Sequence, residues 1–380
     1  MVKEMTNWNE IVRLFPINDS QIWLNNCGVS PGNNNSVNRV KSHYDDFSLN
    51  GIYLKKDNLL TIKEEIKTTL SKLLNCNPQD LALIHNTAEG ANSISLGIQL
   101  ETNDEIILLE DEYPSNHFPW LHWQEKGIKI TYLKSKSSTD EYLHTFQKTI
   151  TDKTKLVALS AVHWCTGVVL PVNKIAQICK EHDILFFLDG AQGVGHVPLD
   201  LNLISFSAFS AWKWLLGPAG LGVLYISNDV IRKVKPLFSG PGLVKDPSEY
   251  KPYDEILQSV NRYEYSTPPF SNWIYFHESL KLLESLGWEN VMNYITNLSV
   301  QLANSLAELG YEVFNKNITT MKSAIISFSH PMKNVEELLK YLQDNKIIGQ
   351  IRANRMRFSP HICNTKDQID KVISVLSDFI

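Results

Sequence analysis

A lysine and an aspartate stand where they could act together. Lys213 lies between two tryptophans in the segment 209–222, and Asp189 ends an earlier apolar run. A lysine that loses its proton can attack a carbonyl and form a Schiff base, and an aspartate at a strand end can pair with a cationic ring nitrogen. The two residues therefore point to a carbonyl cofactor that carries a protonated ring.

Further side chains could hold the same cofactor. Thr87 and Ala88 lie in a turn before a predicted helix, where backbone N–H groups and a hydroxyl form an anion site. Ser210 offers a second hydroxyl for that anion, and Gln192 could donate to a phenolic oxygen. Tyr113 could lay its ring against the cofactor. This set predicts pyridoxal 5'-phosphate with its phosphate on the turn.

Each of these residues also has a structural interpretation. Asp189 could cap the turn after its strand, Thr87 could serve only as a helix cap, and Tyr113 could be a core residue. The residues nevertheless occur in a consistent order, and four of the features follow successive predicted strands. That coincidence favours the functional interpretation.

Polar residues near both ends of the chain are candidates for binding a substrate. Arg355 and Arg357 stand close to the C-terminus, and a planar guanidinium fits a carboxylate with two hydrogen bonds. Either arginine could instead be a solvated surface residue, and the sequence does not choose between them. Asn26 belongs to an asparagine-rich segment that we expect in an active-site loop, and it is the second substrate candidate.

The candidate residues need a sheet to bring them together. Short apolar runs alternate with helical patterns from residue 81 to 226, which predicts a mostly parallel sheet covered by helices, with functional groups at its carboxyl edge. The expected strands are Leu81–Ile84, Ile106–Glu110, Ile128–Leu133, Leu156–Val162, Ile184–Leu188, Ile204–Phe209 and Gly222–Ile226. The clearest helices between them are Glu89–Leu100, with Thr87 as its cap, and Asn173–His182.

A second, smaller α/β unit follows a long loop at 237–269, which is rich in proline and glycine. Its expected helices are Trp273–Leu286, Trp288–Leu309, Val335–Asn345 and one from Asp367, and its expected strands are Tyr311–Phe314, Ala324–Phe328, Ile347–Ile351 and Met356–Ser359. We therefore predict a large cofactor-binding domain at 18–265 and a small domain made of 1–17 and 270–380.

Bulk properties exclude several classes of protein. With 380 residues, of which 43% are hydrophobic and 20% charged, the chain can bury a large core. A net charge of -5 gives no general attraction to nucleic acids or anionic membranes. The five cysteines have no zinc-ligand spacing, and no signal peptide or long apolar segment is apparent. We expect a soluble cytoplasmic protein without a metal.

The order of these motifs resembles the class V aminotransferase family of fold type I pyridoxal-phosphate enzymes over nearly the whole chain. The matching segments are Leu24–Pro31, Asn86–Gly90, Glu112–Trp120, Leu188–Gln192, Ser210–Gly222 and Arg357–Thr365. The resemblance implies an α/β fold in which Lys213 forms the Schiff base, Asp189 pairs with the pyridinium and Gln192 reaches the phenolic oxygen.

The resemblance also implies the remaining contacts. It places the cofactor phosphate on Thr87, Ala88 and Ser210, with Trp212 beside the lysine. Thr267 would complete the phosphate site from a neighbouring subunit, so a homodimer with a shared active site is expected. Arg357 would take the substrate carboxylate.

Departures from relatives bear on the reaction. Cysteine desulfurases carry a histidine next to the lysine, a histidine stacked on the ring, and a catalytic cysteine in a loop ahead of the C-terminal arginine. Here Trp212 and Tyr113 stand at the first two places, and the segment 345–354 contains no cysteine. Persulfide formation is therefore not expected, although Cys27 and Cys165 offer thiols elsewhere. The aromatic residues look more like the kynureninase and isopenicillin-N-epimerase branches.

The sequence leaves the reaction open. An amino-acid aminotransferase is the first expectation. A C–S lyase that acts by β-elimination on a cysteine-derived substrate is the alternative, and racemisation or epimerisation at Cα is the third. A non-catalytic protein that keeps the fold is disfavoured by the presence of Lys213, Asp189 and Arg357.

Overall fold

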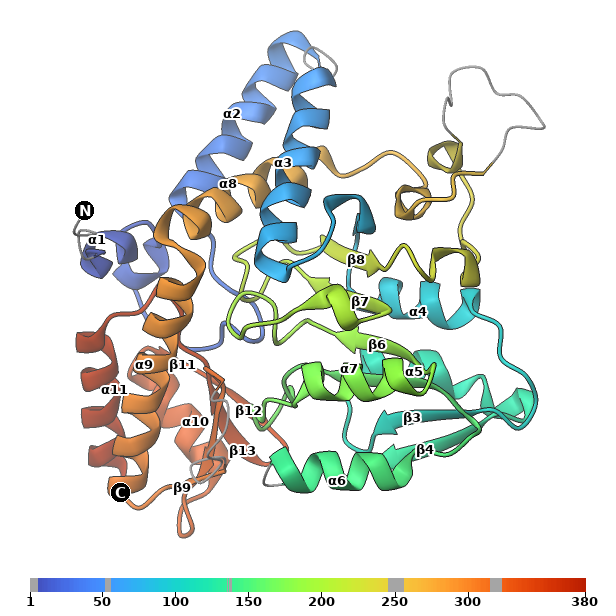
Figure 1. The fold of residues 1–380 in the computed structure, drawn as a ribbon. Coiled ribbons are helices and arrows are strands. Elements are labelled where there is room, and N and C mark those ends of the chain that lie inside the picture. Colours follow the sequence, from blue (N-terminus) through green and yellow to red (C-terminus); the bar gives the residue numbers. More distant parts are fainter. Residues whose placement is uncertain (1–5, 52–55, 135, 137–138, 245–255, 315–322) are drawn as a thin grey trace, which may run out of the picture.

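A seven-stranded sheet forms the centre of the molecule (Figure 1). The computed structural model describes residues 6–51, 56–134, 136, 139–244, 256–314 and 323–380, so part of the predicted loop, 245–255, lies outside the described residues. In pairing order the strands are β2 (Leu81–Ile84), β8 (Gly222–Ile226), β7 (Phe206–Ser210), β6 (Leu185–Asp189), β5 (Thr154–Ser160), β3 (Glu105–Leu109) and β4 (Lys129–Leu133).

The direction of the strands confirms the predicted α/β class. β8 pairs antiparallel with both of its neighbours, and the other pairs in this sheet are parallel. Every residue of β3, β6 and β7 is buried or nearly so, which explains their uninterrupted apolar character. Asp189 and Ser210 are the last residues of β6 and β7, so these two side chains reach the carboxyl edge of the sheet.

Helices cover both faces of this sheet. α4 (Thr87–Gly97) and α5 (Pro114–Leu121) pack on one face, while α6 (Thr139–Thr149) and α7 (Val172–Glu181) pack on the other. Gly90 lets α4 approach β7 closely, because a Cβ at this position would lie 2.5 Å from the Cβ of Ala208. The N-terminus of α4 is thereby held against the end of β7.

A four-stranded antiparallel sheet lies in the C-terminal part of the chain. It pairs β12 (Gln350–Arg352), β13 (Arg355–Phe358), β10 (Ile326–Ser329) and β9 (Glu312–Val313) in that order. The helices α8 (Phe270–Leu286), α9 (Trp288–Glu308), α10 (Val335–Asp344) and α11 (Lys366–Phe379) belong to the same part of the sequence. The predicted single strand 347–351 is therefore wrong, because β11 (Ile347–Ile348) leaves this sheet and pairs with β1 (Ile22–Trp23).

Residues from the N-terminal region also join the C-terminal core. Ile22 and Leu24 pack in one apolar cluster with Leu298 and Phe358. The predicted boundary at residue 18 would place the first two in the other domain. The division into 18–265 and the remainder stays a prediction.

Two helices that the sequence did not predict stand beside α8. α2 (Asn34–Asn50) and α3 (Lys56–Leu74) run next to each other at the top of Figure 1, and α8 passes under both. Before them lies the short α1 (Trp8–Val12). α2 buries only Ser36 along its length, and its apolar residues Val37, Val40, Tyr44 and Phe47 stay half-buried or exposed although they recur at helical spacing.

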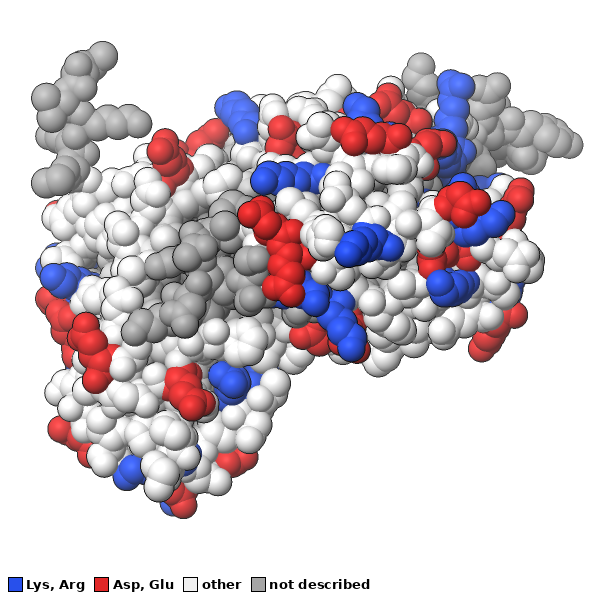
Figure 2. Space-filling model, turned by 60° about the horizontal axis from the view of Figure 1, so that its bottom comes forward, with Lys and Arg blue, Asp and Glu red and all other residues white. Residues whose placement is uncertain are grey.

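The surface carries charges of both signs. Figure 2 shows lysine and arginine side chains interspersed with aspartate and glutamate on the face that it displays, without a broad field of one sign. Within the described ranges, no helix is both long and apolar enough to cross a bilayer, and no three His, Cys, Asp or Glu side chains gather as a metal site.

Candidate active site

A cavity of about 530 Å³ opens at the carboxyl edge of the seven-stranded sheet. Its wall includes nine of the predicted site residues, which come from strand ends, the start of α4 and the hairpin β12–β13. They are Thr87, Ala88, Tyr113, Asp189, Gln192, Ser210, Trp212, Lys213 and Arg357. The structure thus brings residues from distant parts of the sequence around one space.

Lys213 is half-buried and lines this cavity. Burial lowers the pKa of its ammonium group, and the charge of Asp189 acts in the opposite direction. Its Nζ lies 5.7 Å from the centroid of the Tyr113 ring, and it makes no hydrogen bond or ion pair within the described part of the chain. A lysine in this setting releases its proton more readily, which suits it to attack a carbonyl and to serve as a base.

Asp189 is a buried carboxylate without a cationic partner among the described residues. One of its oxygens, Oδ1, accepts a hydrogen bond of 2.8 Å from the backbone N–H of Ala191, and only 3% of the residue is exposed. Burial raises the pKa of Asp189, while the Ala191 hydrogen bond and the charge of Lys213 oppose that rise. A cation placed against this carboxylate would relieve the cost of burying it.

Gln192 is held with its amide nitrogen toward the cavity. The indole Nε1 of Trp214 donates to Oε1 of Gln192 at 3.0 Å, and an indole N–H can only donate. Nε2 of Gln192 therefore donates, and it reaches the carbonyl of Cys27 at 2.9 Å. Trp214 is itself fixed by stacking on His196, with 3.8 Å between the ring centroids.

The turn that begins α4 brings two hydroxyl groups together. Oγ1 of Thr87 and Oγ of Ser210 lie 2.8 Å apart, although they belong to different elements. The prediction that Thr87 caps α4 is wrong, because Asn86 adopts an extended conformation and its side chain accepts from the N–H of Glu89 at 2.9 Å. The Thr87 hydroxyl is therefore left for the cavity, where two hydroxyls and a helix N-terminus suit a phosphate.

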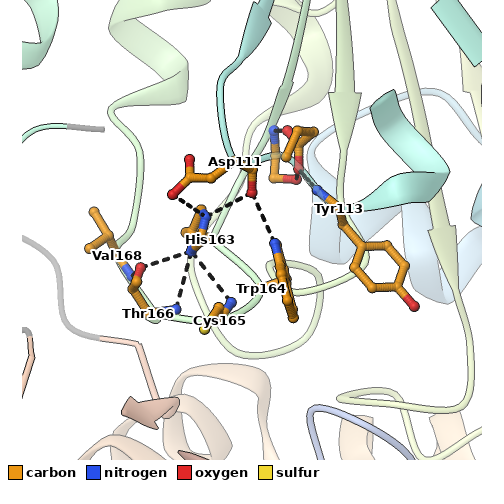
Figure 3. Close-up of polar contacts among 9 residues, drawn as sticks. Asp111, Tyr113, His163, Trp164, Cys165, Thr166 and Val168 are labelled. Carbon is orange, nitrogen blue, oxygen red and sulfur yellow. Dashed lines mark hydrogen bonds and ion pairs between the residues drawn. The ribbon is translucent and has the colours of Figure 1, made fainter. Parts of the chain in front are cut away.

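An aromatic wall lies beside Tyr113 (Figure 3). The Trp164 ring meets the Tyr113 ring edge to face, with 5.6 Å between centroids, and its indole Nε1 donates to the carbonyl of Asp111 at 3.0 Å. His163 also contacts Asp111, because its Nε2 lies 3.1 Å from the carboxylate of Asp111. Its Nδ1 accepts a hydrogen bond of 3.1 Å from the backbone N–H of Thr166. Trp164 could not be recognised as a site residue from the sequence, because its position depends on these long-range contacts.

Arg357 lies next to this aromatic wall. Only 3% of it is exposed; Nη1 donates to the carbonyl of Trp164 at 2.6 Å, and Nη2 lies 3.4 Å from Oε1 of Gln350. Its Nε is buried and has no partner in the described structure. Arg355, the other candidate, lies outside the cavity with its guanidinium 5.0 Å from the centroid of the Phe314 ring. The geometry therefore favours Arg357 as the substrate anchor.

Asn26 and Thr267 do not line this cavity. Asn26 is fully buried, and its Nδ2 donates to the carbonyl of Ser359 at 2.8 Å. Asn25, which comes before the turn that contains Asn26, lines the cavity in its place. Thr267 lines a different groove of about 690 Å³, which also contains His85 and Glu89.

Glu112 supports the site from behind and was not singled out as a site residue from the sequence. Its carboxylate accepts hydrogen bonds from the N–H and hydroxyl of Ser160, the N–H of Tyr113 and the Nδ2 of Asn116. Ser160 is paired in register with Asp189. Burial, with a further contribution from Asp189, raises the pKa of Glu112 from 4.5 to about 7.

The raised pKa of Glu112 predicts a pH dependence of stability. Its pKa is higher in the folded than in the unfolded chain, so the stability that it contributes is fully present below about pH 4.5 and is lost as pH rises through about 7. We expect the thermal midpoint of Glu112→Gln, relative to that of the native protein, to rise over this interval. Parallel midpoint curves would contradict this. Glu110→Gln, at an exposed neighbouring position, is the control.

The residues present fit pyridoxal 5'-phosphate. Asp189 is a buried carboxylate that needs a cation, Lys213 is a half-buried amine without a hydrogen-bonding partner among the described residues, and Thr87 with Ser210 forms a hydroxyl pair at a helix N-terminus. A pyridinium nitrogen, an aldehyde and a phosphate are the groups that these three features suit.

Similarities to other proteins agree with this fit. The model of the family described as "Aminotransferase class-V" matches residues 22–372. A probable cysteine desulfurase of Pyrococcus abyssi is 24% identical over 389 residues and covers 96% of both chains. A probable cysteine desulfurase of Ureaplasma parvum is 26% identical, over 99% of this chain and 94% of that protein.

Solved structures share the fold. The apo cysteine desulfurase of Thermococcus onnurineus superposes with a TM-score of 0.88 at 21% identity, covering 98% of each chain. The cystine C–S lyase C-DES, in complex with cysteine persulfide, gives 0.88 at 22% identity over 96% of this chain and 99% of that one. The chain therefore belongs to the class V aminotransferase family and is a pyridoxal-phosphate enzyme of fold type I.

Proposed function

We propose that this enzyme is a C–S lyase that cleaves the Cβ–S bond of a cysteine-derived amino acid by β-elimination. The observation that carries the proposal is a half-buried Lys213 without a hydrogen-bonding partner in the described structure, in the same cavity as Arg357. In this proposal Lys213 is the base and Arg357 the anchor for the amino-acid carboxylate, and both line one cavity. Relatives named cysteine desulfurase and cystine C–S lyase support a reaction at a carbon–sulfur bond.

Arg357 and Lys213 have different roles in the proposed elimination. Arg357 holds the substrate α-carboxylate, and the Nζ of Lys213 takes the proton from Cα. The bound cofactor supplies an electron sink for the pair left at that carbon. The Cβ–S bond then breaks, and the same Lys213 ammonium can return the proton to the leaving sulfur. A lowered pKa of Lys213 favours both proton transfers. The amine is more often neutral before it takes the proton from Cα, and its ammonium form is a stronger acid when it returns the proton to sulfur.

The fate of the sulfur separates a lyase from a desulfurase. No cysteine occurs in the segment 345–354, where desulfurases carry their sulfur acceptor by the resemblance stated above. Cys27 is the thiol that lines the described cavity, and its backbone is tied to Gln192 and Ser359. We therefore propose that sulfur leaves with the product rather than being passed to a thiol of the enzyme.

The other reactions expected from sequence have less support. Aminotransfer, the first expectation, draws its support from the family description, whereas the named relatives favour the C–S lyase alternative. No feature of the cavity favours racemisation or epimerisation. The β-elimination hypothesis is therefore preferred to aminotransfer and to racemisation or epimerisation.

Product analysis of the holoenzyme with cysteine-derived amino acids tests the proposal. We expect pyruvate, ammonia and a sulfur product without an added 2-oxo acid, and we expect Cys27→Ala to retain at least about half of the native turnover, because no step uses that thiol. Accumulation of the amine form of the cofactor, or a requirement for a 2-oxo acid, would instead establish transamination. Loss of sulfur release in Cys27→Ala would identify that thiol as a sulfur acceptor. Cys179→Ala, at a buried position on α7, controls for packing effects.

We also propose that the enzyme works as a homodimer. Thr267 lies in the 690 Å³ groove, whose wall includes Leu59, Tyr265 and Phe270. This groove adjoins the turn that carries Thr87, because His85 and Glu89 line the groove while Asn86 and Ala88 line the cavity. A second copy seated there could bring its own Thr267 to the phosphate end of the cavity.

A further inference from the structure

A second arginine lies at the active-site cavity beside Arg357. Arg352 lines the cavity and is half-buried, and its Nη1 donates to the carbonyl of Ile351 at 3.0 Å. In the β12–β13 hairpin, Gln350 pairs with Arg357 and Arg352 pairs with Arg355. Because side chains alternate along a strand, Arg352 and Arg357 project from the same face of the hairpin.

The charges around the cavity do not balance. Asp189 is the only carboxylate in its described wall, whereas Lys213, Arg352 and Arg357 supply three basic groups. Neither arginine forms an ion pair with an aspartate or glutamate among the described residues. A concave site with this excess of positive charge attracts anions.

The residues proposed to hold the cofactor include neither arginine. Its ring nitrogen would pair with Asp189, and its phosphate would lie at the Thr87 and Ser210 hydroxyls. After burial, the group that acts most on Arg352 is instead Arg357, the candidate substrate anchor. One substrate carboxylate satisfies Arg357 and leaves Arg352 without an anion.

The electrostatics of Arg352 agree with a role in binding an anion. Burial and the positive charge of Arg357 lower the pKa of Arg352 from its ordinary value. An anion bound at Arg352 would offset both effects. It would accept hydrogen bonds from the guanidinium, and it would reduce the repulsion between the two like charges.

We propose that the substrate carries a second anionic group at the far end of its side chain, and that Arg352 binds this group while Arg357 binds the α-carboxylate. The proposal rests on the proposed function for the amino-acid nature of the substrate. It adds the substrate class: a cysteine-derived amino acid that ends in an acid, rather than cysteine itself. Arg352 is then a specificity-determining residue.

Matched acid and amide ligands test this inference. The probes are S-carboxymethyl-L-cysteine against its carboxamide, and L-glutamate against L-glutamine. Binding is measured by titrating the visible absorption of the holoenzyme, so that affinity is obtained whether or not the ligand is cleaved. For at least one pair we expect the acid to bind about tenfold more tightly than the amide, as for one charge-assisted contact at a half-buried site.

Variants of the hairpin assign the preference to one side chain. Arg352→Gln should remove the preference for the acid and leave the affinity for the amide within about twofold. Arg355→Gln, on the same hairpin but outside the cavity, should leave both affinities unchanged. Equal binding of acid and amide by the native holoenzyme, or a preference that survives in Arg352→Gln, would overturn the inference. Absence of elimination products with every ligand would reject the C–S lyase function and leave the binding result intact.

Discussion

Replacing Lys213 with alanine is expected to remove the visible absorption band of the holoenzyme and to lower turnover by at least about 10⁴-fold, because the covalent link and the base at Cα are lost together. The fold should persist. The Nζ of Lys213 makes no hydrogen bond or ion pair in the described chain, and the contact from Ser30 Oγ goes to its backbone carbonyl, which alanine keeps. Absorption spectra with added cofactor and thermal midpoints of the apoenzyme measure the two effects.

Lys67 provides a contrasting control, since this lysine is fully buried and is ion-paired in the described structure. Its Nζ lies 2.9 Å from a carboxylate oxygen of Glu264 and 2.9 Å from Oδ1 of Asn261. Removing one member of a buried ion pair typically costs about 3–5 kcal/mol, so Lys67→Ala should destabilise the protein without removing the band from the folded fraction. If Lys213→Ala kept the band, or lost stability as Lys67→Ala does, the assignment of Lys213 would fail.

The central sheet could be predicted because most of its strands are buried on both faces; the edge strand β4 is the exception. β2 and β8 begin and end where the apolar runs predicted, and the other five strands of this sheet differ by one or two residues. Their continuous apolar character has no helical period to compete with it. Because most of the strands were predicted to be parallel, their carboxyl ends were expected at one edge of the sheet. Asp189 and Ser210 were therefore expected to lie at that same edge.

Short elements were predicted less well, because their limits depend on contacts distant in sequence. The predicted strand 347–351 divides at Gly349, where a Cβ would overlap the ring of Phe358, so the chain changes from one sheet to another at that point. The N-cap of α4 is Asn86 and not the predicted Thr87, and the reason for this difference is local. Either residue type can cap, and the sequence alone did not show that the Thr87 hydroxyl is engaged by Ser210.

The cofactor side of the site was easier to predict than the substrate side. Lys213, Asp189 and Gln192 follow strands, so their positions are set by the sheet. Trp164 and Arg352 lie on a loop and a short hairpin, and their relation to the cavity depends on the pairing of β12 with β13 and on hydrogen bonds to Asp111. A period-two pattern puts several arginines of the hairpin on one face, but it does not say which of them reach the cavity.

Asp189→Asn should separate the charge of this residue from its structural contact. Asparagine keeps an Oδ1 that can accept from the N–H of Ala191, as the carboxylate does at 2.8 Å, so the turn after β6 is preserved. It cannot stabilise a protonated ring nitrogen. We expect turnover to fall by about 10²-fold or more, the size typical for removal of one preorganised electrostatic partner, with the link to Lys213 retained.

Two measurements besides activity distinguish this role of Asp189 from a structural one. The apoenzyme of Asp189→Asn should be at least as stable as the native apoenzyme, because an unpaired buried carboxylate has been removed, while the stabilisation gained on adding the cofactor should shrink. The pKa of Glu112 should also fall, since the charge of Asp189 is the second largest cause of its rise. A less stable apoenzyme with unchanged cofactor binding would show instead that Asp189 only shapes the turn.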